Sequence, residues 1–166
     1  MSIEIATSLP ELTLVQLRPE DGRPLFELID RNRPHLSQHE DDTSARYPDH
    51  ESVLRSITDP EKNKLRFGVW SGTTLVGVAY LKLSGDTVAE LGYWIGSEFT
   101  RRGYATAAGT SLRLWAETER GYINLVAFSH RNNTTSHRVL ARCGFRFSCV
   151  WPGTKNAFLF RWRKAA

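Results

Sequence analysis

The stretch LGYWIGSEFTRRGYATAA, residues 91–108, joins an apolar run to a series of small residues through a short basic loop. The apolar run ends a predicted strand over 87–95, and the small residues begin a predicted helix. The first turn of a helix has about four N–H groups without intrahelical partners and about half a positive charge, so this junction suits an anion. Gly103 lets the main chain approach a phosphate, and Arg101 and Arg102 add positive charge. A helix start that merely needs a small residue explains the same letters equally well, because one glycine in a basic loop is a weak motif.

Hydrophobic patterning around this stretch predicts the remaining elements. The further strands are expected at residues 12–17, 65–70, 75–83, 122–128, 145–151 and 157–162. Helices are expected to open at Pro19 and at the N-cap Asp49, to run through Ala105, Ala108, Leu112 and Trp115, and to span 133–143. A polar loop is expected from Pro34 to Pro48.

The order of these elements defines the expected fold class. Short turns join the strands between 65 and 95, which indicates an antiparallel meander. We therefore expect an α/β (α+β) fold with a mostly antiparallel, mixed central sheet flanked by helices. The length of 166 residues and the absence of long linkers predict a single domain over residues 1–166.

Charge is divided unevenly along the chain. The net charge is +4, but residues 1–100 hold 10 Lys and Arg against 16 Asp and Glu, whereas residues 101–166 hold 12 against 2. Such asymmetry hints at an anionic partner for the C-terminal part. No signal peptide or apolar stretch of about 18 residues is found, so we expect a cytoplasmic protein. Cys143 and Cys149 lack metal-ligand spacing, and no disulfide or metal site is predicted.

Three motifs resemble those of the GNAT acetyltransferases. Residues 100–105, TRRGYA, resemble the family's acyl-CoA-binding motif Q/R-x-x-G-x-G/A. Residues 133–145, NTTSHRVLARCGF, resemble its N-x-x-[AS] helix ending in GF, and residues 90–95, ELGYWI, resemble the strand before the CoA loop. The chain is most similar to the RimJ/RimL-like branch, which acetylates N-terminal amines of ribosomal proteins and includes relatives that act on small molecules.

The resemblance implies acetyl-CoA as co-substrate and a particular way of binding it. It places a splay between the fourth and fifth predicted strands, where main-chain groups of one strand pair with the pantetheine arm. The residues implied in cofactor binding are Tyr93, Trp94, Ile95, Arg101, Arg102, Gly103, Tyr104, Ala105, Thr106 and Asn133. Thr100 departs from the family's Gln or Arg, which puts one side-chain contact to the pyrophosphate in doubt. Asn133 is equally well explained as the N-cap of the helix that follows it.

The implied reaction is direct transfer of an acetyl group to a primary amine, without a covalent enzyme intermediate. Glu90 matches the family's acidic residue and is the candidate base, since a protonated amine cannot attack. Alternatively, Glu90 has no catalytic role, and its carboxylate pairs with an Arg side chain or accepts a hydrogen bond from a backbone N–H. Leu140 occupies the position of the tyrosine that protonates the departing thiolate in many GNAT enzymes. The RimJ/RimL-like pattern also lacks that tyrosine and assigns the role to a serine, so the resemblance implies Ser136 as the candidate acid.

The acceptor is less legible. Residues 39–42, HEDD, lie in the segment that borders the acceptor cleft in this family. Their negative charge could attract a cationic peptide or a small-molecule amine. A charge run of this kind is also often only a solvated loop. A homodimer is a possible assembly. Two other functions remain open: a nucleic-acid-binding module using the basic C-terminal third, and a CoA-binding GNAT protein without activity. The aromatic residues among the C-terminal cations alternate within a strand, which favours core packing over base stacking.

Overall fold

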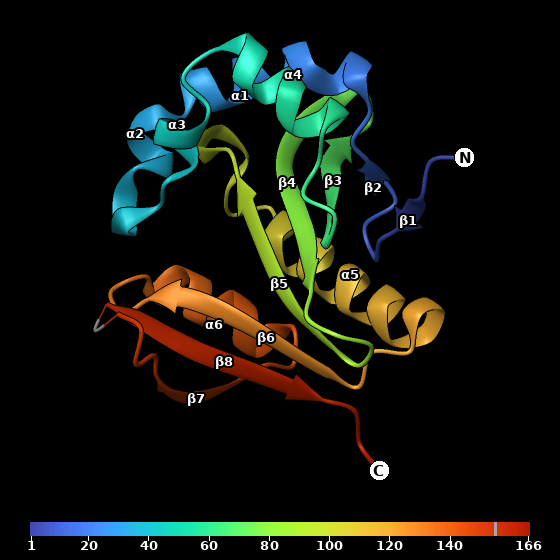
Figure 1. Ribbon diagram of the computed structural model, residues 1–166, viewed down its shortest axis with the longest axis vertical. Coiled ribbons are helices and arrows are strands. Elements are labelled where there is room, and N and C mark those ends of the chain that lie inside the picture. The colour runs from blue at the N-terminus through green and yellow to red at the C-terminus, as the bar shows by residue number, and fades with distance from the viewer. Residues whose placement is uncertain (155) are drawn as a thin grey trace.

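The computed structural model, in which residues 1–154 and 156–166 are described, is built around one twisted sheet of eight strands (Figure 1). The strands are β1 (Glu4–Ala6), β2 (Leu12–Gln16), β3 (Lys64–Ser71), β4 (Thr74–Leu83), β5 (Val88–Ile95), β6 (Asn124–His130), β7 (Arg146–Val150) and β8 (Ala157–Arg163). They lie in the order β1-β2-β3-β4-β5-β6-β8-β7. Every neighbouring pair is antiparallel except β5 and β6, which are parallel. The mostly antiparallel, mixed sheet expected from the sequence is confirmed.

The parallel pair opens soon after it begins. β5 pairs with β6 only over Val88 to Glu90, and beyond Glu90 the two strands separate (Figure 1). This is the splay expected between the fourth and fifth predicted strands, which are the fifth and sixth strands of the structure because β1 was not predicted. The splay leaves main-chain groups of β5 without a neighbouring strand, and it divides the sheet into an N-terminal and a C-terminal part.

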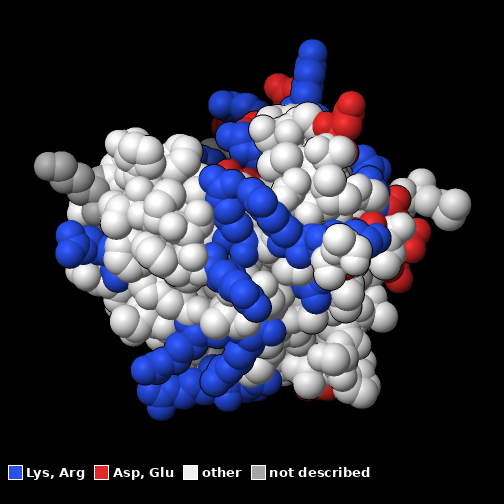
Figure 2. Space-filling view, turned by 90° about the horizontal axis from the view of Figure 1, so that it is seen from below, with Lys and Arg blue, Asp and Glu red and all other residues white. Residues whose placement is uncertain are grey.

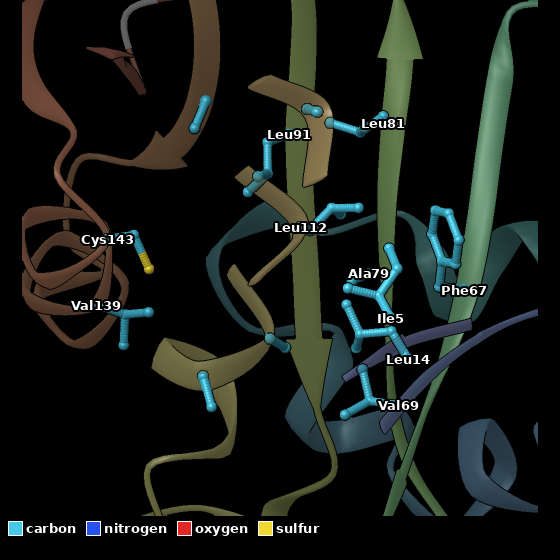
Figure 3. Packing of buried hydrophobic residues seen from close by; sticks show 14 of the residues in the cluster. Ile5, Leu14, Phe67, Val69, Ala79, Leu81, Leu91, Leu112, Val139 and Cys143 are labelled. Carbon is cyan, nitrogen blue, oxygen red and sulfur yellow. The ribbon is translucent and has the colours of Figure 1, made fainter. Parts of the chain in front are cut away.

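Helices cover both faces of the sheet. They are α1 (Gly22–Arg31), α2 (Arg33–Leu36), α3 (Thr43–Arg46), α4 (His50–Thr58), α5 (Tyr104–Arg120) and α6 (Thr134–Arg142). The helix α5 packs on the face made by β2 to β5, where Leu112 lies among Leu14, Phe67, Leu81 and Leu91 (Figure 3). The helices α1 and α4 cover the opposite face through a second core that includes Leu28, Val53 and Val78. No helix in the described part of the chain is long and apolar enough to cross a membrane.

Two regions differ from the sequence-based expectation. β1 is an additional three-residue strand that pairs Ile5 with Leu14, and its alternation is too short to stand out in a pattern. The segment from Pro34 to Pro48 is not a simple polar loop, because it contains α2, a 3-10 turn (Gln38–Glu40) and α3. The guanidinium of Arg33 donates to the carbonyl oxygens of Ser44 (2.9 Å) and Tyr47 (3.1 Å) and so folds these short turns onto one another.

Candidate active site

A cavity of about 440 Å³ lies at the splay. Its walls come from β3 and β4, from the exposed edge of β5, from β6 and α6, and from the segment around α3. Glu90, Tyr93, Trp94 and Ser136 all line this cavity. The structure thus brings together both candidate catalytic residues and part of the strand expected to hold pantetheine.

Glu90 is held by a tyrosine on the neighbouring strand. The hydroxyl of Tyr80 on β4 donates to Oε1 of Glu90 at 3.0 Å, and the Nζ atom of Lys64 lies 4.7 Å from the centre of the Tyr80 ring. Burial, followed by the nearby Glu90 carboxylate, raises the pKa of Tyr80, so its hydroxyl stays protonated and can donate. In the described residues Glu90 has no Arg partner within 4.0 Å, so the carboxylate is not engaged in the ion pair considered as an alternative.

The position of Tyr80 depends on a glycine in β5. Tyr80 and Gly92 are directly opposite in the register of β4 and β5, and a Cβ atom on Gly92 would lie 2.2 Å from Cζ of Tyr80. Only glycine leaves room for the ring to cross β5 and reach Glu90. Sequence reasoning missed Tyr80, and the one available signal was this glycine inside an otherwise apolar strand.

Ser136 also has a tyrosine partner. The hydroxyl of Tyr93 lies 3.2 Å from Oγ of Ser136 and 3.4 Å from its carbonyl oxygen. Burial raises the pKa of Tyr93, which keeps this hydroxyl protonated. Asn133 caps α6, because its side-chain oxygen accepts from the N–H of Ser136 at 3.1 Å, and Leu140 is buried in the core. The phenol near Ser136 therefore comes from β5 rather than from position 140.

The exposed edge of β5 offers only alternate residues to a ligand. The N–H of Gly96 donates to the carbonyl oxygen of Val76 on β4, and alternate residues of a strand direct their main-chain groups to the same neighbour. The main-chain groups of Trp94 therefore face β4, whereas those of Tyr93 and Ile95 face the splay. A ring nitrogen of His35 already contacts the carbonyl oxygen of Ile95 at 3.0 Å.

The basic loop reaches α5 through two residues of positive φ. Arg101 has φ 62° and the N-cap Gly103 has φ 78°, and a Cβ at Gly103 would meet no atom within 4 Å. The N–H groups of Tyr104, Ala105 and Thr106 have no hydrogen-bond acceptor in the described chain. The loop thus presents an open concavity of free donors, which is the arrangement that binds anions at helix N-termini.

The side chains of this loop have separate roles. The guanidinium groups of Arg101 and Arg102 are exposed, and Arg102 donates to the carbonyl oxygen of Glu98 at 3.3 Å. The Tyr104 side chain is buried with its hydroxyl 3.1 Å from Oγ of Ser71, so only its main chain is open to a ligand. The Thr100 hydroxyl donates to the carbonyl oxygen of Ser97 at 2.9 Å, which closes the preceding 3-10 turn.

A buried asparagine, missed at the sequence level, anchors the same loop to α1. The side-chain oxygen of Asn32 accepts from the N–H of Ser97 (2.8 Å) and from its hydroxyl (2.9 Å), while its Nδ2 donates to the carbonyl oxygen of Leu28. Arg31 pairs with Glu98 at 3.0 Å beside it. The end of α1 therefore fixes the entry to the basic loop, a relationship between segments far apart in sequence.

The acidic run 39–42 is divided between two places. Asp41 and Asp42 line the cavity. Glu40 instead accepts from Nδ2 of Asn156 at 2.8 Å, and the ring of His39 lies 5.5 Å from that of His130. Half of the run thus reaches the candidate acceptor side, and the other half contacts the end of β6.

Some cations of the C-terminal part lie on the surface, and one of them, Arg113, lies inside the structure. Figure 2 shows a band of Lys and Arg across the face seen from below, toward which α6, β7 and β8 lie in Figure 1. Arg113, by contrast, is internal: it donates to the carbonyl oxygen of Cys143 at 2.9 Å, lies 5.0 Å from the Trp162 ring and pairs with Glu117. Both cysteines are free, and the described residues contain no cluster of three or more potential metal ligands.

Comparison with solved structures identifies proteins that share this fold. The chain has the fold of RimL, a ribosomal L7/L12 alpha-N-protein acetyltransferase solved in complex with coenzyme A, with 15% identity, a TM-score of 0.87 and coverage of 97% of this chain and 98% of that one. The acetyltransferase that modifies the N-terminal serine of L7/L12 in Salmonella typhimurium gives 14% identity, a TM-score of 0.83 and coverage of 98% and 100%. The microcin C7 self-immunity acetyltransferase MccE, solved with acetyl-CoA and AMP, gives 20% identity, a TM-score of 0.77 and coverage of 94% of both chains.

Sequence comparison places the chain in a family. No curated protein sequence matches it. The family model of the acetyltransferase (GNAT) domain matches residues 11–146, which is most of the chain and includes β2 to β6, α5 and α6. The chain therefore belongs to the GNAT acetyltransferase family, and its fold is shared with RimL-type ribosomal-protein acetyltransferases.

Proposed function

We propose that the protein transfers an acetyl group from acetyl-CoA directly to a primary amine, either a protein N-terminus or a small-molecule amine. The observation that carries the proposal is the cavity at the splay, which has Glu90 on one wall and Ser136 on another, with the free edge of β5 between them. This arrangement supports a catalytic GNAT protein over one that only binds CoA. The packing of Phe158 and Phe160 on the His137 ring leaves those ring faces unsuited to stacking with bases, which weighs against a nucleic-acid module.

Acetyl-CoA binding rests on two sets of main-chain donors. The free N–H groups at the start of α5 would take the pyrophosphate, with Arg101 and Arg102 adding charge around it. The pantetheine arm would lie along β5, and the carbonyl oxygen of the thioester would accept from the N–H of Tyr93 or Ile95. A donor held in place before reaction stabilises the negative charge that develops on that oxygen.

Glu90 would act as the base. The attacking amine is largely protonated at neutral pH, since amino groups have pKa values of about 8 to 10. Glu90, directly or through water, removes a proton so that the nitrogen lone pair can attack the thioester carbon and form the C–N bond. Tyr80 orients the carboxylate through its 3.0 Å hydrogen bond.

Ser136 would protonate the leaving group. As the C–S bond breaks, its electron pair goes to sulfur, the CoA thiolate takes the proton of the Ser136 hydroxyl, and the new amide nitrogen loses its extra proton to water. Tyr93, with its hydroxyl 3.2 Å from Oγ of Ser136, can then return a proton to the serine and regain one from solvent. No covalent bond to the enzyme forms in this sequence of steps.

Thermal melting with acetyl-CoA tests binding. Saturating acetyl-CoA should raise the melting temperature of the wild type, because a ligand that binds only the folded state stabilises it. Gly103→Asp should abolish the rise by placing a carboxylate in the anion site. Gly103→Asn is the matched control, since Asn tolerates positive φ and has nearly the same shape without the charge. No shift for the wild type would contradict the proposal.

Turnover tests the chemistry. A panel of amines and N-terminal peptides is screened with acetyl-CoA, and the release of free CoA is measured. We expect at least one member of the panel to be acetylated. With that acceptor, Glu90→Gln should lower kcat with little change in the KM for acetyl-CoA. A variant with the wild-type rate would remove Glu90 from the mechanism.

A further inference from the structure

The guanidinium of Arg66 on β3 is half-buried and has no carboxylate partner within 4.0 Å. In the described residues its side-chain hydrogen bonds go only to Ser56, from Nη1 to the hydroxyl (2.8 Å) and to the carbonyl oxygen (3.5 Å). It lies 5.4 Å from the centre of the Tyr47 ring, and no carboxylate approaches it within 4.0 Å. Burial lowers the pKa of Arg66, but a guanidinium remains charged at any working pH. Three or more of its five N–H donors are therefore free for another acceptor.

This cation lines two recesses at once. One is the cavity at the splay, and the other is a recess of about 320 Å³ between α4 and β3, lined also by Arg46, Tyr47 and Arg55. Arg66, Tyr80 and Gly92 occupy one row across β3, β4 and β5. Since neighbouring strands are about 4.8 Å apart, the Cα atom of Arg66 lies about 10 Å from the edge strand that would hold the thioester.

The other cations of these recesses each have a carboxylate within 4.0 Å. Arg46 pairs with Asp42 at 2.7 Å and Arg55 with Glu51 at 2.7 Å. Lys64 and Lys82 both pair with Glu61, at 3.4 Å and 4.0 Å. Arg66 is thus the one cation of the two recesses without an ionic partner among the described residues. A half-buried charge without a partner is costly, and such a cost persists where a ligand supplies the missing charge.

We propose that the acceptor amine of this protein also carries an anionic group, a carboxylate or a phosphate, that binds Arg66. The inference rests on the proposed acetyl transfer and names the class of its acceptor. The planar guanidinium matches the two oxygens of either anion, so Arg66 would fix the far end of the acceptor while its amino group reaches the free edge of β5. Asp41, which lines the same cavity and pairs with no cation in the described residues, suits the cationic end of such a molecule.

Matched acceptors test the proposal by kinetics. The panel consists of ω-amino carboxylates of increasing chain length, aminoalkyl phosphates of the same lengths, and the corresponding amides and alcohols, which lack the charge. We expect kcat/KM to be about ten- to a hundredfold higher for the anionic members, as charge-assisted hydrogen bonds confer. R66Q should erase this preference and leave the KM for acetyl-CoA unchanged. Comparison of the amino carboxylates with the aminoalkyl phosphates identifies the preferred anion. Equal kcat/KM values for charged and uncharged acceptors would overturn the proposal, whereas the proposed acetyl transfer would still stand.

A binding measurement decides the question even where no amine is acetylated. Inorganic phosphate and succinate are titrated into the protein without acetyl-CoA, and binding is followed by the shift in melting temperature. One or both should stabilise the wild type more than R66Q, and any stabilisation common to the two proteins comes from the anion site at the start of α5. R55Q is the matched control, because Arg55 lines the same recess but is exposed and ion-paired, and it should respond as the wild type does. R66M should melt no lower than the wild type, since it removes an uncompensated charge. Equal anion response of the wild type and R66Q would contradict the inference.

Discussion

The hydroxyl of Tyr80 on β4 donates to the carboxylate of Glu90 on β5 over 3.0 Å, inside the cavity at the splay. The two residues are not directly opposite: Tyr80 pairs with Gly92, and its ring crosses that glycine to reach Glu90. A neutral donor leaves the charge of the carboxylate in place while fixing its direction. Tyr80 is therefore positioned to orient the candidate base without neutralising it.

Tyr80→Phe should lower kcat by about tenfold, because a hydrogen bond to a charged group contributes about 1.5–3 kcal/mol and part of that is regained from water. The KM for acetyl-CoA should stay the same, since Tyr80 belongs to β4, which pairs with β5 on the side away from the splay. Steady-state kinetics with both substrates varied measures the two effects. A rise in the KM for acetyl-CoA with unchanged kcat would place Tyr80 in cofactor binding instead.

Gly92→Ala should disturb the same pair by a different route. The added methyl would lie 2.2 Å from Cζ of Tyr80, so the ring must leave its position over β5. Overpacking of this kind costs about 1–3 kcal/mol, and the displaced ring cannot reach Glu90. Urea unfolding should show the loss of stability, and kcat should fall at least as far as in Tyr80→Phe. In the double variant Gly92→Ala/Tyr80→Phe the kinetic losses should not add, because both remove one hydrogen bond.

Tyr93 and Ser136 should act as a unit. Their hydroxyl oxygens are 3.2 Å apart, and Tyr93→Phe and Ser136→Ala each break the same contact. Each single variant should slow acetyl transfer in single-turnover experiments, and the double variant should be little slower than Ser136→Ala. Losses that simply add would show that the two hydroxyls act independently. Unchanged single-turnover rates for Ser136→Ala would exclude it as the acid.

Much of the fold could be predicted from local patterns. The expected N-cap Asp49 accepts from the N–H of Ser52 at 2.8 Å, and α4 begins at the next residue. The helix expected at 133–143 forms as Thr134–Arg142 behind its cap Asn133. The strand predicted over 87–95 forms as Val88–Ile95, with Ala89 and Leu91 buried in the core while Glu90 lines the cavity. Each of these features depends only on residues that are close together in the sequence, so local patterns are enough to predict it.

The side-chain partners in the cavity could not be predicted in the same way. Tyr80 reaches Glu90 only in the observed register of β4 and β5, and Arg66 stands in the same row only through the pairing of β3 with β4. Tyr93 contacts Ser136 because α6 packs against the splay, although 43 residues separate them in the chain. Registers and packing distances arise from the whole sheet, so no local motif encodes these contacts.

The ionisation of Tyr80 and Tyr93 predicts how stability depends on pH. Burial raises the pKa of both hydroxyls above the value of about 10 that tyrosine has in an unfolded chain. Above about pH 10 the unfolded state therefore loses these protons while the folded state keeps them, so the free energy of unfolding should fall as the pH rises. Each tyrosine contributes up to about 1.4 kcal/mol per pH unit in this range. Urea unfolding between about pH 8 and about pH 11 measures this fall in the free energy of unfolding. The fall should be shallower for Tyr80→Phe and Tyr93→Phe than for the wild type, and shallowest for the double variant. Equal slopes in all four proteins would mean that the fold keeps neither hydroxyl protonated.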